Sequence, residues 1–291
     1  MRVLLLGGES LLGQSLLRLA ADENISLDAP ECPAEGWRAE SLGPLLAQYQ
    51  PDAVVNLAFY HEQFQLGLIG AESLALQRAF ALALIDYCAD QDVLLLQCSG
   101  ARVFDGLKAT PYTEKDELSP GDALGQMQAD LEQQLLNRCR RHLILRLSWV
   151  LDTAPDGQLL RLLEQLRSHE PVLLAEEWRG NPTPVEDAAR VILALLKQLD
   201  CDAGLYGVYH YGSSEASSWI SFAKSLAQEL MAGRDIEHDP AIRSVPFDQQ
   251  VEAAWEPRNA VLASRRLLMV FGVKPRAWRA QLPALLSRLR A

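Results

Sequence analysis

Short apolar runs alternate with segments of helical periodicity through the first half of the chain. The runs are continuously apolar, and they read RVLLLG, DAVVNLA, DVLLLQCS and HLILRLSWV. Helical periodicity covers SLLGQSLLRLAAD, residues 71–90 and residues 122–138. A strand that is apolar on both sides is buried on both faces, which is typical of a parallel sheet with helices above and below it. The pattern predicts a doubly wound α/β domain over residues 1–150.

The rhythm changes after Trp149. Helices are expected at QLLRLLEQLRS, up to about Lys197, from Ser217 to about Ala232, and at the Arg- and Leu-rich end of the chain. Pro and Gly interrupt them in WRGNPTPVED, and Pro does so in DPAIRSVPF. We expect a smaller α+β lobe over residues 151–291, with residues 183–210 returning to the first domain.

Charge and composition exclude several classes of partner. The chain has 291 residues and a formal net charge of -11, which opposes binding to nucleic acid or to anionic lipid. Its five cysteines are scattered and form no C-x-x-C pair with histidine partners, so a reducing, cytoplasmic setting with free thiols is expected. No apolar stretch is long enough to cross a membrane, and the five histidines show no metal-ligand spacing.

The stretch LLLGGESLLGQSLL places glycines between the first strand and the first helix. Gly7 and Gly13 fit the outer positions of a G-x-x-G-x-x-G turn, where backbone N–H groups can hold a pyrophosphate. Ser10 stands at the middle position, where its side chain crowds the phosphates or its hydroxyl donates to them. Alternatively, the glycines serve only a tight turn.

Asp28 ends the second expected strand, at the distance where an acid would hold a ribose 2'-hydroxyl. No arginine follows it directly, so NAD is favoured over NADP; the alternative is that Asp28 is a solvated loop residue. The candidate cofactor-binding residues are Gly7, Ser10, Leu11, Leu12, Gly13, Asp28, Asn56 and Ala58.

Further motifs follow in a consistent order, namely PDAVVNLAFY, SGARVFDG, PYTEKDELSP, ILRLSWV, RGNPTPVEDAA and PRNAVL. With these motifs the chain resembles, essentially end to end, the dTDP-4-dehydrorhamnose reductase family of extended short-chain dehydrogenase/reductases. The resemblance implies a Rossmann domain that binds NAD or NADP and a C-terminal lobe that closes over a nucleotide-sugar. The family also contains the regulatory beta subunit of methionine adenosyltransferase, so the fold can serve a partner enzyme.

The family's chemistry is reduction of a keto-sugar by hydride from the cofactor. A tyrosine protonates the alkoxide, and a lysine four residues later lowers the pKa of that tyrosine. A hydroxyl residue at the end of the preceding strand orients the substrate oxygen. Candidate substrate-binding residues, at family positions around the mouth between the lobes, are Arg146, Asn181, Arg258 and Asn259.

The departures from the family fall on this chemistry. Leu124 aligns with the tyrosine and Gln128 with the lysine, and Gly100 stands where the orienting hydroxyl is expected. Leucine cannot donate a proton, and glutamine has no charge with which to lower a neighbouring pKa. Ser99 keeps a hydroxyl one position too early. The standard mechanism is therefore predicted to be absent, as in a pseudoenzyme.

A substitute proton donor could come from Tyr60 or His61, which follow the strand DAVVNLA at the edge where ligands collect. The alternative is that Tyr60 is a rim aromatic and His61 an exposed loop residue. Three hypotheses follow. The chain is a non-catalytic binding or regulatory protein for a nucleotide, a dinucleotide, a nucleotide-sugar or a partner enzyme, with a homodimer compatible; or it is an NAD(P)-dependent reductase or epimerase with a relocated donor; or it is an interaction protein with an empty cleft.

Overall fold

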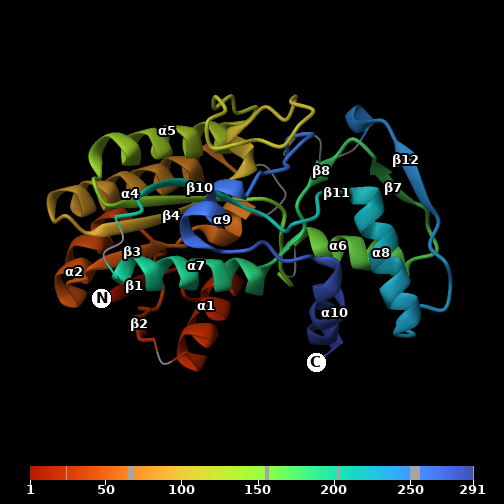
Figure 1. Ribbon diagram of the computed structural model, residues 1–291, viewed down its shortest axis with the longest axis horizontal. Helices are drawn as coiled ribbons and strands as arrows, with labels where there is room; N and C mark the ends of the chain where they lie inside the picture. Colours follow the sequence, from red (N-terminus) through yellow and green to blue (C-terminus); the bar gives the residue numbers. More distant parts are fainter. Residues whose placement is uncertain (24, 65–68, 155–156, 202–203, 250–255, 291) are drawn as a thin grey trace.

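A six-stranded parallel sheet forms the larger lobe of the computed structural model, which describes residues 1–23, 25–64, 69–154, 157–201, 204–249 and 256–290 (Figure 1). All five neighbouring strand pairs run parallel. In spatial order the strands are β2 (Leu27–Asp28), β1 (Val3–Leu6), β3 (Ala53–Asn56), β4 (Leu94–Gly100), β5 (His142–Leu147) and β10 (Gly207–Tyr211).

Successive residues of each strand enter two different apolar cores. In β1, Val3 and Leu5 pack on one side of the sheet, whereas Leu4 and Leu6 pack on the other. This explains the continuous apolar runs, because side chains alternate between the faces of a strand and here both faces are covered. The expected doubly wound α/β architecture is confirmed.

Helices cover both faces of the sheet, as Figure 1 shows for α4 and α5 above it and α1 and α7 below it. The first face carries α2 (Ala39–Tyr49), α4 (Ala71–Asp90) and α5 (Ala123–Arg138). The second face carries α1 (Leu11–Asp22), α7 (Val185–Asp200) and α9 (Arg265–Phe271). Short α3 (Tyr60–Phe64) follows β3.

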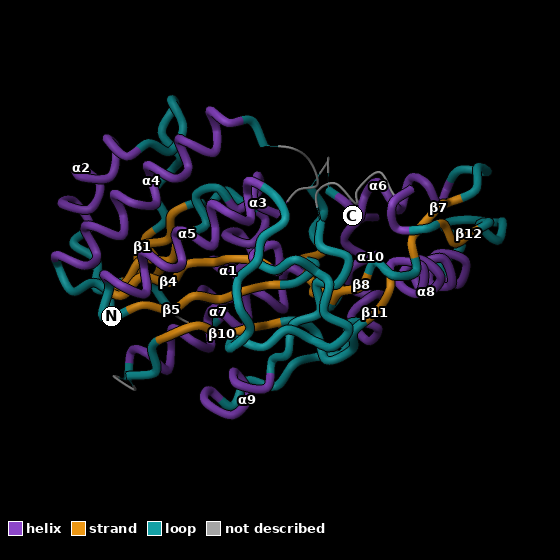
Figure 2. The backbone as a smooth tube through the Cα atoms, turned by 90° about the horizontal axis from the view of Figure 1, so that it is seen from above, coloured by secondary structure: helices purple, strands orange, loops and turns teal. Residues whose placement is uncertain are grey.

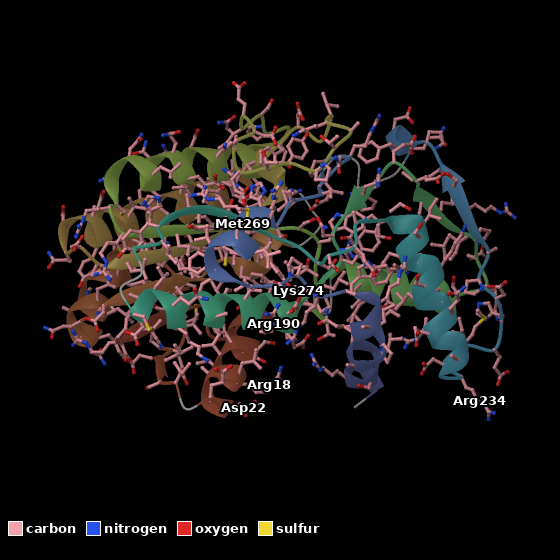
Figure 3. All side chains as sticks on the ribbon, in the orientation of Figure 1. Arg18, Asp22, Arg190, Arg234, Met269 and Lys274 are labelled. Atoms are coloured by element: carbon pink, nitrogen blue, oxygen red, sulfur yellow. The ribbon has the colours of Figure 1, made fainter. Side chains whose placement is uncertain are left out.

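Arg190 joins three segments on the second face. It lies on α7, pairs with Asp187, and donates to the hydroxyl of Tyr211 on β10. Its guanidinium also reaches the backbone oxygen of Lys274 at 3.4 Å, and Figure 3 shows these two labelled residues close together. Helix α7 and strand β10 are therefore parts of the larger lobe.

The smaller lobe combines short sheets with three helices. Its strand pairs are β7 (Val172–Ala175) with β12 (Ile242–Val245), β8 (Arg179–Gly180) with β11 (Ser217–Ser218), and β6 (Val150–Leu151) with β9 (Thr183–Pro184). Its helices are α6 (Gln158–Arg167), α8 (Trp219–Ala232) and α10 (Leu282–Arg290). Four tryptophans pack in its core, namely Trp149, Trp178, Trp219 and Trp278.

The strands of the large sheet point toward the smaller lobe. Figure 2 shows them running from the N-terminal side of the molecule to the region where the two lobes meet. Ligands of open α/β sheets bind beyond the carboxyl ends of the strands, which here is the junction of the lobes. No helix among the described residues has the length and apolar character needed to cross a bilayer.

Candidate functional site

Three neighbouring cavities lie where the strand ends meet the smaller lobe. The first, of about 40 Å³, is lined by residues that include Gly100, Gln128, Asp152 and Glu256. A second, of about 180 Å³, shares Arg102 and Glu256 with the first and extends along the smaller lobe. A third, of about 10 Å³, lies at the ends of β3 and β4. The residues predicted from the catalytic motif thus do meet at a cavity.

Close backbone packing explains both glycines of the turn after β1. Gly7 has a φ of +82°, and a Cβ there would lie 2.1 Å from the backbone oxygen of Leu57. A Cβ on Gly13 would lie 2.4 Å from the backbone oxygen of Gly7. No real Cβ tolerates such contacts, so the turn itself requires both glycines, whether or not a phosphate binds.

Ser10 caps the first turn of α1. Its hydroxyl accepts a hydrogen bond from the N–H of Gly13 at 3.0 Å and donates to the backbone oxygen of Gly7 at 2.7 Å. This hydroxyl is therefore engaged within the turn. Leu11 and Leu12 begin the helix, where N–H groups point out of the helix end and can meet an anion.

The loop after β2 is acidic. Asp28 is exposed at the end of that strand, and Glu9 of the glycine turn accepts a hydrogen bond from the indole of Trp37 at 2.9 Å. Burial, reinforced by the negative charges of Glu9 and Glu35, raises the pKa of the Cys32 thiol. These surroundings suit a ribose hydroxyl better than a 2'-phosphate.

Asn56 is held rigidly at the end of β3. Its amide nitrogen donates to Gln97 at 2.8 Å, and its amide oxygen accepts from the N–H of Ala58 at 3.2 Å. Both cofactor candidates of this segment therefore bond to each other, and Asn56 is also bonded to the neighbouring strand β4.

Helix α5 carries the two altered positions on its inner face. Leu124 is 4% exposed and belongs to the apolar core between α5, α4 and the sheet. Gln128 is 5% exposed, and neither its amide nitrogen nor its amide oxygen has a hydrogen-bond partner among the described residues. The hydroxyl oxygen of Ser99, on β4, is likewise buried and without a described partner.

The position of α5 is fixed at its first turn. Asp122 caps the helix by accepting the N–H of Gly125 at 2.6 Å. A Cβ on Gly125 would lie 2.3 Å from the backbone oxygen of Arg102, so the helix lies directly against the 3-10 turn Ala101–Val103. Leu124 and Gln128 are therefore brought to the ends of the strands by the packing of the helix.

Tyr60 and His61 lie beside an acid that sequence reasoning missed. The Tyr60 hydroxyl is 3.5 Å from the Asp152 carboxylate, and the charge of His61 also acts on Asp152. Burial raises the pKa of Tyr60 well above its usual range, and the Asp152 charge adds to this. Burial also raises the pKa of Asp152. Tyr60 is thus a weaker acid than usual, whereas Asp152 takes up a proton more readily than usual.

A second missed group lies on the other side of the cavity. Arg102 is 5% exposed, with its Nε 3.2 Å from Asp122 and 3.9 Å from Glu256. Burial raises the pKa of Glu256, which Arg102 opposes and Asp122 reinforces. Asp152 could have been suspected because it directly follows a short apolar strand; Glu256 has no such signal, because the fold alone brings it to Arg102.

Three of the four substrate-binding candidates make internal hydrogen bonds. Arg146 is 3% exposed and binds Glu132 and His210. Asn181 and Asn259 use both ends of their amides on backbone groups. Arg258 is exposed on the wall of the second cavity, 4.9 Å from the ring centre of Phe247. It alone of these four lines one of the three cavities described above.

The described residues contain no cluster of three or more His, Cys, Asp or Glu side chains that could hold a metal ion. All five cysteines are free thiols. The chemistry available at the junction of the lobes is therefore that of carboxyl groups, amides, a guanidinium and backbone N–H groups.

Comparison with known proteins gives a consistent result. Residues 1–291 match the family model described as RmlD substrate binding domain. The dTDP-4-dehydrorhamnose reductase of Aggregatibacter actinomycetemcomitans is 25% identical over 97% of each chain. That of Sinorhizobium fredii is 27% identical over 78% of this chain and 77% of its own.

Solved structures show the same fold. A dTDP-4-dehydrorhamnose reductase from Clostridium acetobutylicum superposes with a TM-score of 0.82 at 20% identity, covering 100% of both chains. The Bacillus anthracis reductase in complex with NADP gives 0.81 at 18% identity over 99% of both chains. The resemblance noted from the sequence is confirmed at the level of the family and the fold.

Proposed function

This chain belongs to the RmlD substrate binding domain family, and from that premise we propose that it is a divergent member which binds ligand but lacks tyrosine-dependent ketoreduction. The ligand would be a nucleotide, a dinucleotide or a nucleotide-sugar held between the lobes. Its relatives are reductases of a dTDP-sugar, which supports a nucleotide-sugar as the ligand class.

The side chains on the inner face of α5 carry this proposal. Leu124 places an apolar group in the core where the family has its proton donor, and Gln128 supplies a neutral amide in place of a cation. Gly100 adds no hydroxyl at the end of β4. Loss of an acid catalyst alone costs on the order of a hundredfold to ten-thousandfold in rate.

The residues present fit a nicotinamide dinucleotide at several points. The N–H groups of Leu11 and Leu12 at the start of α1 would hold the pyrophosphate, and Asp28 would accept a hydrogen bond from a ribose hydroxyl. The acidic loop around Glu9 favours NAD over NADP. When bound, the dinucleotide would supply hydride; the chain's own residues would bind and orient it. The free thiols support a reducing, cytoplasmic setting for this role.

Native mass spectrometry of gently purified protein tests this proposal first. A retained dinucleotide, nucleotide or nucleotide-sugar is expected, whereas an empty cleft that also fails to bind added NAD or dTDP-sugar contradicts it. Hydride transfer from NADH or NADPH to a dTDP-4-keto-sugar is then measured. Turnover in the range of about 1 to 1,000 per second, typical of enzymes, would refute the loss of ketoreduction. If ligand binds without turnover, a regulatory role toward a partner enzyme is the natural next test.

A relocated proton donor is the second candidate, and Asp152 is the observation that favours it. Its carboxyl group lines the same cavity as Gly100 and Gln128, and burial raises its pKa. In such a reductase, hydride would add to the carbonyl carbon and Asp152 would give its proton to the carbonyl oxygen. Tyr60 would position that carboxyl group, since its own pKa is raised.

The Asp152→Asn variant tests the second candidate in any preparation with detectable turnover. Loss of the rate, together with loss of the acidic limb of its pH profile, is expected if Asp152 donates the proton. The exposed Asp130→Asn variant on α5 is the control. An unchanged rate in Asp152→Asn rules this candidate out.

A further inference from the structure

Five amide side chains are almost completely buried in the described part of the chain, each of them 8% exposed or less: Asn56, Gln77, Gln128, Asn181 and Asn259. Four of them use both the amide nitrogen and the amide oxygen in hydrogen bonds within the protein. Gln128 uses neither. Leaving both ends of a buried amide unpaired is costly, and the rest of this chain avoids it.

The unpaired amide of Gln128 faces the cavity between the lobes. Gln128 lines that cavity together with Trp149, whose indole nitrogen is also buried without a described partner. Ser99, with its unpartnered hydroxyl, directly precedes the wall residue Gly100. Three polar groups from β4, α5 and the segment after β5 thus lie at one cavity without partners in the protein.

We propose that Gln128 recognises a vicinal diol of the bound ligand. Its amide nitrogen would donate to one hydroxyl while its amide oxygen accepts from the next, a pairing that an amide can make and that a lysine, which only donates, cannot. The inference rests on the proposed function, because it assigns a residue and a chemical group to ligand binding in that same cleft. The acids Asp152 and Glu256 on the cavity wall can accept from further hydroxyls.

The volumes of the cavities agree with recognition of a small part of a larger ligand. About 40 Å³ accommodates roughly one water-sized group, which suits hydroxyls rather than a whole ring. The neighbouring cavity of about 180 Å³ adds room beside Arg102 and Arg258, whose cations can meet a phosphate. The diol could be that of the ribose of a dinucleotide or that of the pyranose of a nucleotide-sugar.

The test uses the full chain with Gln128→Met, which keeps the length of the side chain and removes both polar atoms. Calorimetry compares NAD with AMP, and dTDP-glucose with dTDP, because the second probe of each pair lacks the sugar carrying the candidate diol. We expect a weakening of about tenfold to a hundredfold for one diol-bearing probe and no change for its truncated partner. Gln128→Glu, which keeps only an acceptor, should lose less. Gln126→Met, on the exposed side of α5, is the matched control.

The melting temperature of the ligand-free variant is a second readout. Gln128→Met should melt about 2–4 °C above the wild type, because a buried unpaired amide has been removed. A lower melting temperature contradicts the inference by indicating that the protein itself satisfies the amide. Unchanged affinity for both diol-bearing probes also overturns it, while the proposed function stands. If the wild type binds neither probe pair, both proposals fail. Weakening confined to NAD assigns the diol to ribose, and weakening confined to dTDP-glucose assigns it to the pyranose.

Discussion

Glu132 on α5 and Arg146 on β5 form a buried ion pair, with the Arg146 Nε 3.0 and 3.1 Å from the two carboxylate oxygens. Glu132 is 1% exposed and Arg146 is 3% exposed. Eight residues before Glu132 the same helix carries Leu124, so the pair anchors the altered helix to the sheet. The register of α5 is thus maintained by contacts that do not involve the positions of the family's tyrosine and lysine.

Substitution of Glu132 by Gln should destabilise the protein strongly. The change leaves the Arg146 charge buried without its counter-charge, which typically costs about 3–5 kcal/mol of the free energy of unfolding. Urea unfolding measures this loss. The control is Asp130→Asn on the exposed side of α5, expected to stay within about 0.5 kcal/mol of the wild type. A loss of less than about 1 kcal/mol in Glu132→Gln would mean that the pair does not anchor the helix.

His210 should make stability depend on pH. It is buried beside Arg146, and burial together with the Arg146 charge lowers its pKa to about 3. As pH falls below the ordinary value of about 6.5, the unfolded chain takes up a proton that the folded chain refuses, so stability is complete above that pH and declines toward pH 3.

Between pH 6.5 and 5, before most carboxyl groups titrate, the decline should approach about 1.4 kcal/mol per pH unit. Unfolding of wild type and His210→Asn across this range measures the slope, which the variant should lack. His169→Asn, at an exposed position, should keep it. Equal slopes in wild type and His210→Asn would show that His210 is not the source.

Gly13→Ala should destabilise the ligand-free protein. The new Cβ would meet the backbone of Gly7 and Gly8 at 2.4 to 2.9 Å, and a backbone cannot give way as a flexible side chain can. We expect a loss of about 2 kcal/mol or more, measured by urea unfolding. Gly121→Ala, with nothing within 4 Å of its Cβ, should be neutral or slightly stabilising. A harmless Gly13→Ala would leave phosphate approach as the remaining reason for glycine.

Restoring the family's side chains should restore turnover if their loss is the defect. The variant Gly100→Thr/Leu124→Tyr/Gln128→Lys returns the orienting hydroxyl, the proton donor and the cation to their positions. We expect hydride transfer to a keto-sugar nucleotide to rise at least about a hundredfold over the wild type. The Leu124→Phe/Gln128→Met variant controls for side-chain size. No gain in a folded triple variant would place the defect elsewhere in the cleft.

The large sheet was predictable because its strands are apolar on both sides and its main helices have clear periodicity. Helix α4 begins and ends at the expected residues 71 and 90. Helix α2 was not foreseen, since Gly43 and Pro44 stand inside it and read as a break in sequence. The pairing of β7 with β12 was also missed, because these short strands lie about 70 residues apart.

The site was predictable only where one helix or one turn carries it. The substitutions at 124 and 128 share a helix, so their spacing placed them together. Asp152 meets Tyr60 from 92 residues away, and Glu256 reaches Arg102 from the other lobe; such meetings depend on how the lobes pack. Likewise, only the structure could show that the Ser10 hydroxyl is bound within its own turn.

Trp149 stands where the chain first passes from the large sheet to the smaller lobe. It adopts a φ of +39°, unusual for a bulky residue, and its ring lies against Gly180, where a Cβ would be 2.4 Å away, and stacks on Trp219 at 4.6 Å. Its backbone oxygen also accepts the N–H of Thr183 at 2.9 Å. This crossing is therefore a fixed pivot, and the lobes would widen the cleft by rotating about residue 149 rather than by drawing straight apart.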